Sequence, residues 1–337
     1  MTDPTHVPLV TIVIPARNEG QEIPKALDHV AAQTYPLDCI EVVVVDGASQ
    51  DNTVEVTRVA LGEVPFRRAE VISNPKATTP SNLNRGLEWA AGDILVRVDS
   101  RSFIPPNYVE RLVAVLRDPA VAVAGGSQVA VARSDSLKDR AIARALNNRY
   151  AMGGSSYRRE GASSGPVDTV YLGSFRSEEL RKAGGWNEAF PTNQDFELNR
   201  RMSEIGQVWF EAGLPVGYVG RARLRELWAQ YHRFGRWKVR YWRRTNDRPQ
   251  RRQWVLVAGP AAAGLVATAV GVARPELVPM AAILAVPAFL AVDAVGGDRG
   301  PEGVGGRFVS GLANVLIGAG WWTGIAREYV SHETWPS

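Results

Sequence analysis

The sequence predicts an α/β domain over residues 1–220, then an amphipathic interface helix within the basic aromatic segment 221–252, and a C-terminal α-helical transmembrane region over 253–337. Three observations predict this organisation: β-branched runs that alternate with helical patterns, a strongly basic segment, and charge-free apolar runs. The mean composition conceals them, because a net charge of +4 and 45% hydrophobic residues are ordinary for a soluble protein of 337 residues. A single cysteine excludes an intrachain disulfide.

Strands are expected where β-branched residues run almost without interruption. Residues 10–14, 41–46 and 94–99 form such runs, and continuous hydrophobicity is typical of buried parallel strands. The second and third runs end on an acid, Asp46 and Asp99. Because open α/β sheets bind ligands outside the carboxyl ends of their strands, both acids are candidates for a ligand site.

Helices are expected between these strands. The pattern favours a helix over 20–33. The following Tyr35-Pro36 ends it, because a residue before proline avoids the helical conformation. A second helix follows Asp51 or Asn52, either of which can cap it. Its apolar positions are Val54, Val56 and Val59. A third helix is expected over 82–91.

Between residues 221 and 252 the chain carries twelve Lys and Arg but only two acids. Leucine and aromatic residues recur there at helical steps: Leu224, Leu227, Trp228, Tyr231, Phe234, Trp237, Tyr241 and Trp242. Such a helix lies in the headgroup plane of a membrane, where each basic residue adds about 1 kcal/mol of attraction to anionic lipid. Packing of this helix as core is the structural alternative. Nucleic acid is not an expected partner, because the segment continues into an apolar run.

Three apolar runs follow, 254–273, 277–292 and 308–326, and a bilayer core about 30 Å thick needs roughly 20 such residues in a helix. The first and third runs reach this length, and the second does so only if Asp293 lies near an interface. The arginine pair at 251–252 places the preceding domain in the cytoplasm by the positive-inside rule. We therefore expect a multi-pass protein of the inner (plasma) membrane; three core helices of a soluble protein are the alternative.

Polar segments suited to chemistry follow the predicted strands. Residues 14–19 and 45–53 follow the first two, where a carboxylate and a helix N-terminus can bind a ribose or a phosphate. Residues 92–101 contain the third, and Asp99 at its end can hold Mg²⁺ or Mn²⁺, because hard divalent ions take oxygen ligands. Ordinary strand–turn–helix connections and an acid that only caps a turn are the structural alternatives.

The segment 193–201 has a helical pattern rich in charge. At helical spacing Asp195 and Asn199 share a face, whereas Glu197 lies about 160° from Asp195. We expect one of these two carboxylates to face the crevice as a base and the other to be held elsewhere by one of the arginines at 200 and 201. An exposed helix with many charges is the alternative.

In type and order these segments resemble the motifs of the family-2 inverting glycosyltransferases, which have the GT-A nucleotide-sugar-binding fold, a Rossmann-like mixed sheet. The motifs are PARNE, VDGASQDNT and VDSR after successive strands, GGWNEAF with QDFELNRR, and RFGRW at 233–237. The chain looks most like the membrane-bound exopolysaccharide glycosyltransferases of the succinoglycan-biosynthesis type. The resemblance covers about residues 9–245, and the apolar tail agrees with this subgroup.

The resemblance implies roles on the nucleotide side. Residues that stand where the family meets the nucleotide are Pro15, Arg17, Glu19, Asp46 and Asp93. Asp99 stands at the first acid of the family's metal-binding Asp-x-Asp, where Mg²⁺ or Mn²⁺ binds. Arg101 replaces the second acid. Either Asp99 binds the metal with diphosphate and water, or Arg101 supplies part of the charge of the metal.

The resemblance also implies roles on the acceptor side. Asp195 matches the Asp of the family's Glu-Asp pair, with Gln194 in place of the Glu, and acts as the general base. Arg233, Arg236 and Trp237 match the (Gln/Arg)-x-x-Arg-Trp motif, in which Arg binds phosphates and Trp lines the acceptor side. The metal and Arg236 then stabilise the charge on the departing diphosphate.

The implied function is transfer of a hexose from a nucleotide sugar, in the first place a UDP-sugar, to a lipid-linked saccharide or glycolipid at the cytoplasmic membrane face. The context is polysaccharide or cell-envelope glycan biosynthesis. A polyprenyl-phosphate glycosyltransferase, which makes a sugar-monophosphate lipid, is the alternative with the same fold. A processive synthase needs more spans than three runs supply. A non-enzymatic membrane scaffold has no use for the acids at the strand ends.

Overall fold

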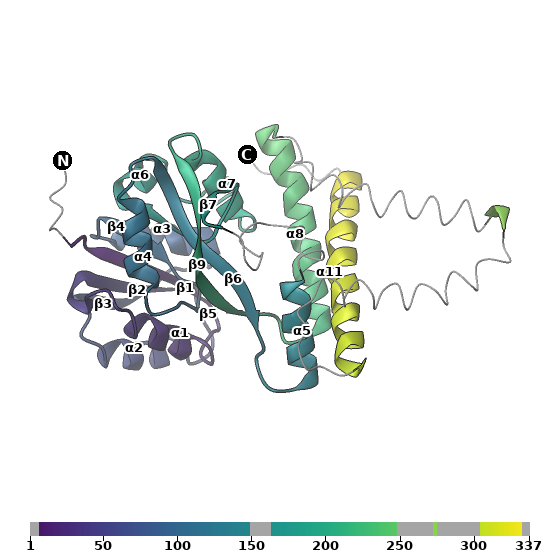
Figure 1. Ribbon diagram of the computed structural model, residues 1–337, viewed down its shortest axis with the longest axis horizontal. Helices are drawn as coiled ribbons and strands as arrows, with labels where there is room; N and C mark the ends of the chain where they lie inside the picture. The colour runs from purple at the N-terminus through teal and green to yellow at the C-terminus, as the bar shows by residue number, and fades with distance from the viewer. Residues whose placement is uncertain (1–6, 149–162, 248–271, 275–303, 332–337) are drawn as a thin grey trace. The chain divides into compact units, whose positions relative to one another are not determined.

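The computed structural model describes residues 7–148, 163–247, 272–274 and 304–331 (Figure 1). The chain divides into two compact units. The first comprises Met1–Val129 and Arg159–Tyr218, and the second comprises Ala130–Arg158 and Val219–Ser337.

The first unit is built around a mixed sheet, whose nine strands within the described residues follow the order β3-β2-β1-β4-β8-β6-β9-β5, with β7 paired to β9. The parallel strands are β1 (Val10–Ala16), β2 (Ile40–Asp46), β3 (Arg68–Ser73) and β4 (Ile94–Arg97). The remaining strands are β5 (Ser102–Phe103), β6 (Val121–Val131), β7 (Gly165–Pro166), β8 (Tyr171–Arg176) and β9 (Gln207–Val219). The three predicted strands are confirmed as the parallel neighbours β2, β1 and β4, so their carboxyl ends meet at one edge.

Helices cover the parallel strands and bury their apolar sides. In the first unit they are α1 (Ile23–Ala31), α2 (Thr53–Gly62), α3 (Thr79–Trp89), α4 (Tyr108–Leu116), α6 (Ser177–Lys182) and α7 (Gln194–Met202), with a short 3₁₀ helix at Leu37–Cys39. Every residue of β2 is buried, as expected for a parallel strand covered on both faces. α3 begins earlier than predicted, because the Thr78 side chain caps it and accepts the Ser81 N–H at 3.4 Å.

Two local predictions are wrong in detail. Thr53, Thr57 and Leu61 form the buried face of α2, because residues four apart share a helix face, whereas Val59 of the predicted apolar set is 60% exposed. The buried Thr57 hydroxyl donates to the Thr53 carbonyl oxygen at 2.6 Å, so this threonine needs no polar partner outside the helix. β4 ends at Arg97, two residues before the predicted end, because the chain turns there.

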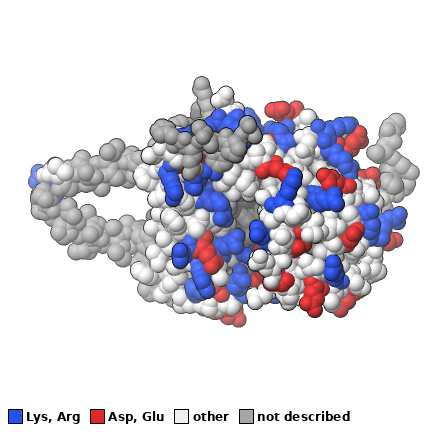
Figure 2. Space-filling view, turned by 180° about the vertical axis from the view of Figure 1, so that it is seen from behind, with Lys and Arg blue, Asp and Glu red and all other residues white. Residues whose placement is uncertain are grey.

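The second unit includes α5 (Leu137–Asn147), α8 (Leu224–Thr245) and α11 (Val304–Val330). Both α5 and α8 lie along α11 (Figure 1). α8 confirms the helix predicted within 221–252, and basic side chains prevail over the face of this unit that Figure 2 shows. Part of its aromatic stripe is buried, as packing of the segment as core requires: Leu227, Tyr231, Tyr241 and Trp242. α5 belongs with these helices, although the sequence places it in the 1–220 domain.

α8 and α11 approach so closely that only glycine fits at their contact. A Cβ atom added at Gly235 would lie 2.1 Å from the Trp321 carbonyl oxygen. One added at Gly324 would lie 2.0 Å from the His232 carbonyl oxygen. Small residues allow this approach of two helix backbones, as they do between helices in lipid.

The third apolar run, 308–326, falls within α11. Its stretch Gly305–Val330, 26 residues, is the one helix among the described residues that is long and apolar enough to cross a membrane. The runs 254–273 and 277–292 lie outside the described residues, apart from the last two residues of the first run. A region of several transmembrane helices therefore stays a prediction.

Candidate active site

The loops after β1 and β2 lie side by side at the carboxyl edge of the sheet and hold each other in place. The Asn18 N–H donates to Ser49 Oγ, and the Gln50 N–H donates to Asn18 Oδ1, both at 2.8 Å. The Glu19 N–H donates to Thr53 Oγ1, also at 2.8 Å. Asn18 has a φ of 55°, in the left-handed region, where non-glycine residues are uncommon and cluster at functional sites. Hydrogen bonds between the two loops therefore fix the arrangement of this edge.

Three residues predicted to meet the nucleotide lie at this edge. Asp46 ends β2, pairs in register with Ala16 of β1, and is 5% exposed. Its carboxylate accepts the Ser49 N–H at 3.1 Å, which fixes the side chain at the turn. Pro15, near the end of β1, is half-buried, and Arg17, the first residue after β1, is exposed. The structure thus brings Pro15, Arg17 and Asp46 together.

Glu19 and Arg101, two more predicted site residues, form an ion pair. Arg101 Nε lies 2.9 and 2.7 Å from the two carboxylate oxygens of Glu19. Burial disfavours the charged guanidinium, but the Glu19 carboxylate outweighs this and raises the pKa of Arg101. Arg101 therefore stays a cation, and it shares its charge with Glu19.

Arg97, which is not among the predicted site residues, connects the remaining two acids. It is the last residue of β4 and is 5% exposed. Its Nε donates to Asp99 Oδ1 at 2.8 Å, and one terminal amino group donates to Asp195 Oδ1. The carboxylates predicted as metal ligand and base thus share one buried guanidinium. The signal in the sequence is an arginine inside an otherwise apolar run, since arginine is rarely buried unless it is paired.

Asp195 lies in the first turn of α7, where the helix dipole favours negative charge. Its side chain is 43% exposed, so a ligand can reach it. The protein packed around the carboxylate still desolvates it and raises the pKa of Asp195; Arg97 lowers this pKa, Asp99 raises it, and the net pKa lies above the ordinary value. A carboxylate with a raised pKa accepts a proton more readily, as a general base must.

Glu197 is buried and is held away from Asp195, as the helical spacing predicts. Arg201 donates to both of its carboxylate oxygens at 2.8 Å. Arg201 also donates to the Gly185 carbonyl oxygen at 2.7 Å. The contact with Gly185 anchors α7 to the segment that precedes it, independently of Arg97.

Asp93 does not share this site. The register pairs Val10 of β1 with Ile94 of β4, so Asp93 lies at the amino edge of the sheet. There its carboxylate accepts the Leu9 N–H at 3.0 Å. The predicted nucleotide-side role of Asp93 is therefore wrong, because only the carboxyl end of β4 reaches the loops that carry the other site residues.

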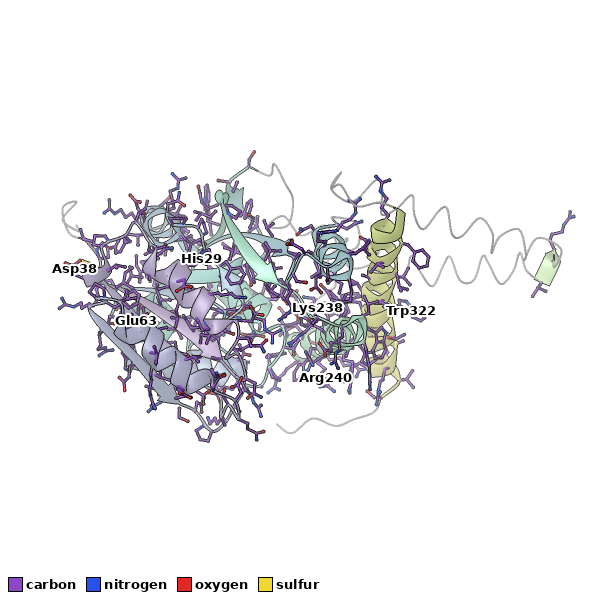
Figure 3. All side chains as sticks on the ribbon, turned by 90° about the horizontal axis from the view of Figure 1, so that it is seen from below. His29, Asp38, Glu63, Lys238, Arg240 and Trp322 are labelled. Carbon is purple, nitrogen blue, oxygen red and sulfur yellow. The ribbon has the colours of Figure 1, made fainter. Side chains whose placement is uncertain are left out.

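The predicted phosphate and acceptor residues lie on α8, in the second unit. Arg236 Nε donates to Glu328 Oε2 at 2.8 Å, and Arg240 Nε donates to Glu328 Oε1 at 2.7 Å. Glu328 on α11 is 1% exposed. Arg233 is exposed, and the Arg240 guanidinium lies 4.8 Å from the centroid of the Trp237 ring (Figure 3 labels Arg240). Arg236 thus has a partner on α11, and its contact with a diphosphate stays a prediction.

This edge of the sheet offers few side-chain oxygens as ligands for a divalent cation. Within the described residues, no group of three or more His, Cys, Asp or Glu side chains forms a metal site. Arg97 contacts one oxygen of Asp99, and Arg101 stands in place of the second acid. The other Asp99 oxygen fits Mg²⁺ or Mn²⁺, because one carboxylate with phosphate oxygens and water can hold such an ion. The site therefore fits a metal only together with a bound diphosphate.

Comparisons with known proteins agree with this reading. The sequence model of glycosyl transferase family 2 matches residues 11–182, which include Asp46 and Asp99 but end before Asp195. The chain is 31% identical over 326 residues to the succinoglycan biosynthesis protein ExoA of Rhizobium meliloti (strain 1021), and the match covers 94% of each chain.

A second relative is the dolichyl N-acetyl-alpha-D-glucosaminyl phosphate 3-beta-D-2,3-diacetamido-2,3-dideoxy-beta-D-glucuronosyltransferase of Methanococcus voltae. Its name gives a lipid-linked sugar as its substrate. It is 24% identical over 235 residues, which cover 67% of this chain and 71% of the relative.

Among solved structures, the mannosyltransferase PcManGT from Pyrobaculum calidifontis, in complex with GDP-Man and Mn²⁺, has a TM-score of 0.65 and 21% identity. The alignment covers 98% of this chain and 90% of that one. This similarity confirms the GT-A-like mixed α/β fold. The family match over half of the chain, with the relative at 31% identity, shows the family. The chain therefore belongs to glycosyl transferase family 2 and is a glycosyltransferase.

Proposed function

We propose that the chain is an inverting glycosyltransferase that moves a hexose from a nucleotide sugar, in the first place a UDP-sugar, to a lipid-linked saccharide or glycolipid. The reaction belongs to polysaccharide or cell-envelope glycan biosynthesis. One observation carries the proposal: Asp99 and Asp195, from distant parts of the sequence, are joined through Arg97 at the edge that also holds Asp46. A donor and an acceptor can meet between acids placed in this way.

The donor lies along the carboxyl edge of the sheet. Asp46, Pro15 and Arg17 receive the nucleoside, and the Arg101 guanidinium faces the diphosphate. Asp99 would hold Mg²⁺ or Mn²⁺ together with diphosphate oxygens, and such an ion would supply positive charge to the leaving group. The Mn²⁺ in PcManGT, which shares the fold, supports this assignment.

Asp195 is the general base. Its carboxylate takes the proton of the acceptor hydroxyl while that oxygen bonds to the anomeric carbon of the sugar. The bond from this carbon to the diphosphate oxygen breaks in the same step, so the configuration inverts and the nucleoside diphosphate leaves. The raised pKa and the partly exposed position of Asp195 suit this role.

The acceptor is placed at the cytoplasmic face of the membrane. We infer a division into a catalytic domain at 1–220, an interface segment at 221–252 and a membrane region at 253–337 that crosses more than once. The basic side chains of the interface segment suit anionic lipid, and α11 has the length and composition of a span. Arg236 and Arg233 serve the diphosphate, and Trp237 serves the acceptor. The dolichyl-linked substrate in the name of the second relative supports a lipid acceptor.

The test compares two carboxylates of the first unit, Asp195 in the first turn of α7 and Asp93 just before β4. The full chain in detergent is first screened against UDP-, GDP- and other nucleotide sugars by thermal shift with Mn²⁺. Transfer to a polyprenyl-diphosphate-linked saccharide is then measured for the wild type, Asp195→Asn and Asp93→Asn. We expect Asp195→Asn to lose transfer by about 100-fold or more while it keeps donor binding, because general base catalysis contributes roughly that much. Asp93→Asn should transfer normally, because Asp93 lies at the opposite edge.

Near-normal turnover of Asp195→Asn removes Asp195 from the mechanism. Absence of any nucleotide-sugar binding by the wild type argues against a transferase that uses these donors. A product in which the sugar sits on a bare polyprenyl phosphate, resolved by thin-layer chromatography, replaces the proposed acceptor by the polyprenyl-phosphate alternative.

A further inference from the structure

We propose that Arg97 is a positioning residue, whose guanidinium holds the metal-side carboxylate of Asp99 and the base Asp195 in one fixed arrangement. This inference rests on the proposed function, and it assigns a role to a residue that no motif of the family marks. It follows from where Arg97 lies, from what it contacts, and from how α7 is anchored.

Arg97 occupies a place where the fold itself calls for an apolar residue. β4 pairs with β1 on one side and β8 on the other, and its residues Leu95 and Val96 are fully buried. A charge buried there is costly unless it is paired and hydrogen-bonded. An apolar side chain would serve the sheet better. The carboxylates that Arg97 contacts therefore explain its presence, and the stability of the sheet does not.

The planar guanidinium sets the geometry of both acids. Nε serves Asp99 and a terminal amino group serves Asp195, so the two carboxylates bind different edges of one rigid fork. The second oxygen of Asp99 stays outside this contact and is available to a metal ion. Hydrogen bonds to a ligating carboxylate orient it and typically change metal affinity or activity by 10- to 100-fold when removed.

The same guanidinium links two separate elements. Asp99 follows β4, whereas Asp195 opens α7, and Arg97 bridges them at the place where donor and acceptor must meet. A displacement of reacting groups by about 1 Å can cost on the order of 100-fold in rate. Arg97 thus couples the donor side and the acceptor side of the reaction within one contact.

Loss of Arg97 is compatible with a folded chain. α7 stays anchored through Arg201, which donates to the main-chain carbonyl oxygens of Ala183 and Gly185 outside the helix, while Glu197 on the same helix holds its guanidinium in place. A matched control lies on the neighbouring strand: Arg176 pairs in register with Ile94 of β4, and its guanidinium donates to the carbonyl oxygens of Leu116 and Val121. Arg176 supports the same sheet without contacting either site carboxylate.

The experiment uses the full chain in detergent with Arg97→Gln, Arg97→Lys and Arg176→Gln. Measured are kcat and KM for donor and acceptor, Mn²⁺ affinity in the presence of nucleoside diphosphate by electron paramagnetic resonance, and Tm. We expect Arg97→Gln to lower kcat by about 100-fold and Mn²⁺ affinity by roughly 10-fold, with a small change in donor KM. Arg97→Lys should recover part of kcat, because the charge remains while the fork is lost.

Arg176→Gln should lower Tm and leave kcat and Mn²⁺ affinity of the folded protein unchanged. The inference is overturned when Arg97→Gln keeps wild-type kcat and Mn²⁺ affinity, or when Arg176→Gln reproduces its losses. If the wild type transfers sugar and Arg97→Gln is equally active, the role of Arg97 is contradicted but the proposed function is not. A wild type that neither binds nor transfers any nucleotide sugar overturns the proposed function and this inference together.

Discussion

The contact between α8 and α11 allows a sharp test of the packing in the second unit. Gly324 on α11 faces the α8 backbone, and an added Cβ would lie 2.0 Å from the His232 carbonyl oxygen. Gly318, six residues earlier on the same helix, has no atom within 4 Å of such a Cβ. Gly324→Ala and Gly318→Ala therefore make the same chemical change in two different surroundings.

The two variants should differ in sign. Replacing glycine by alanine inside a helix normally stabilises it by about 0.5–1 kcal/mol, and Gly318→Ala should show this gain. At Gly324 the new methyl group reaches ordinary contact distance only when the helices separate by about 1.4 Å. Overpacking of this kind costs typically 1–3 kcal/mol. The difference between the variants is therefore about 1.5–4 kcal/mol, which corresponds to roughly 10- to 700-fold in a local opening equilibrium.

Hydrogen–deuterium exchange read by mass spectrometry measures this opening for each helix in the full-length protein. Amides of Leu224–Thr245 and Val304–Val330 should exchange faster in Gly324→Ala and at the wild-type rate or slower in Gly318→Ala. Peptides from β1 and β2 serve as an internal reference. Equal protection of α8 in the two variants would refute the reasoning that backbone contact at Gly324 holds the helix pair.

Two further outcomes concern buried charge and pH. Glu328→Gln removes the carboxylate charge that Arg236 and Arg240 share and should lower the free energy of unfolding by about 2–3 kcal/mol. This is less than the roughly 3–5 kcal/mol of a fully buried pair, because Arg236 is 23% exposed. An unchanged urea midpoint in tryptophan fluorescence contradicts this prediction. The Thr53 hydroxyl lowers the pKa of Asp51 in the folded protein below its ordinary 3.8. The ionised Asp51 therefore stabilises the fold fully above about pH 3.8, and this stabilisation is lost as the pH falls through the lower pKa of the folded state. Asp51→Asn should therefore flatten the decline of Tm below about pH 4, and parallel Tm curves for the two proteins would show that Asp51 has no such role.

Much of the site could be found from the sequence, since Asp46 and Asp99 follow apolar runs and the carboxyl ends of parallel strands meet at one edge. Asp195 could be separated from Glu197 because helical spacing turns them to different faces. Asp93 was misplaced, because both ends of the short strand β4 carry an acid and the resemblance does not say which end faces the ligand. Arg97 was missed, because a sequence shows that an arginine interrupts a strand but not which carboxylates will meet it.

Hydrophobic periodicity acts over a few residues, and for that reason the sequence by itself determined the strands β1, β2 and β4, the basic helix α8 and the apolar character of the α11 segment. It also placed Asp46 at the end of one strand and Asp99 shortly after another. The tertiary structure decided which charges pair: Arg97 with Asp99 and Asp195, Arg101 with Glu19, and Arg236 with Glu328. Except for Arg97 and Asp99, which are two residues apart, those pairs join residues that lie far apart in the chain. The energy of a buried charge depends on the neighbours that folding brings to it.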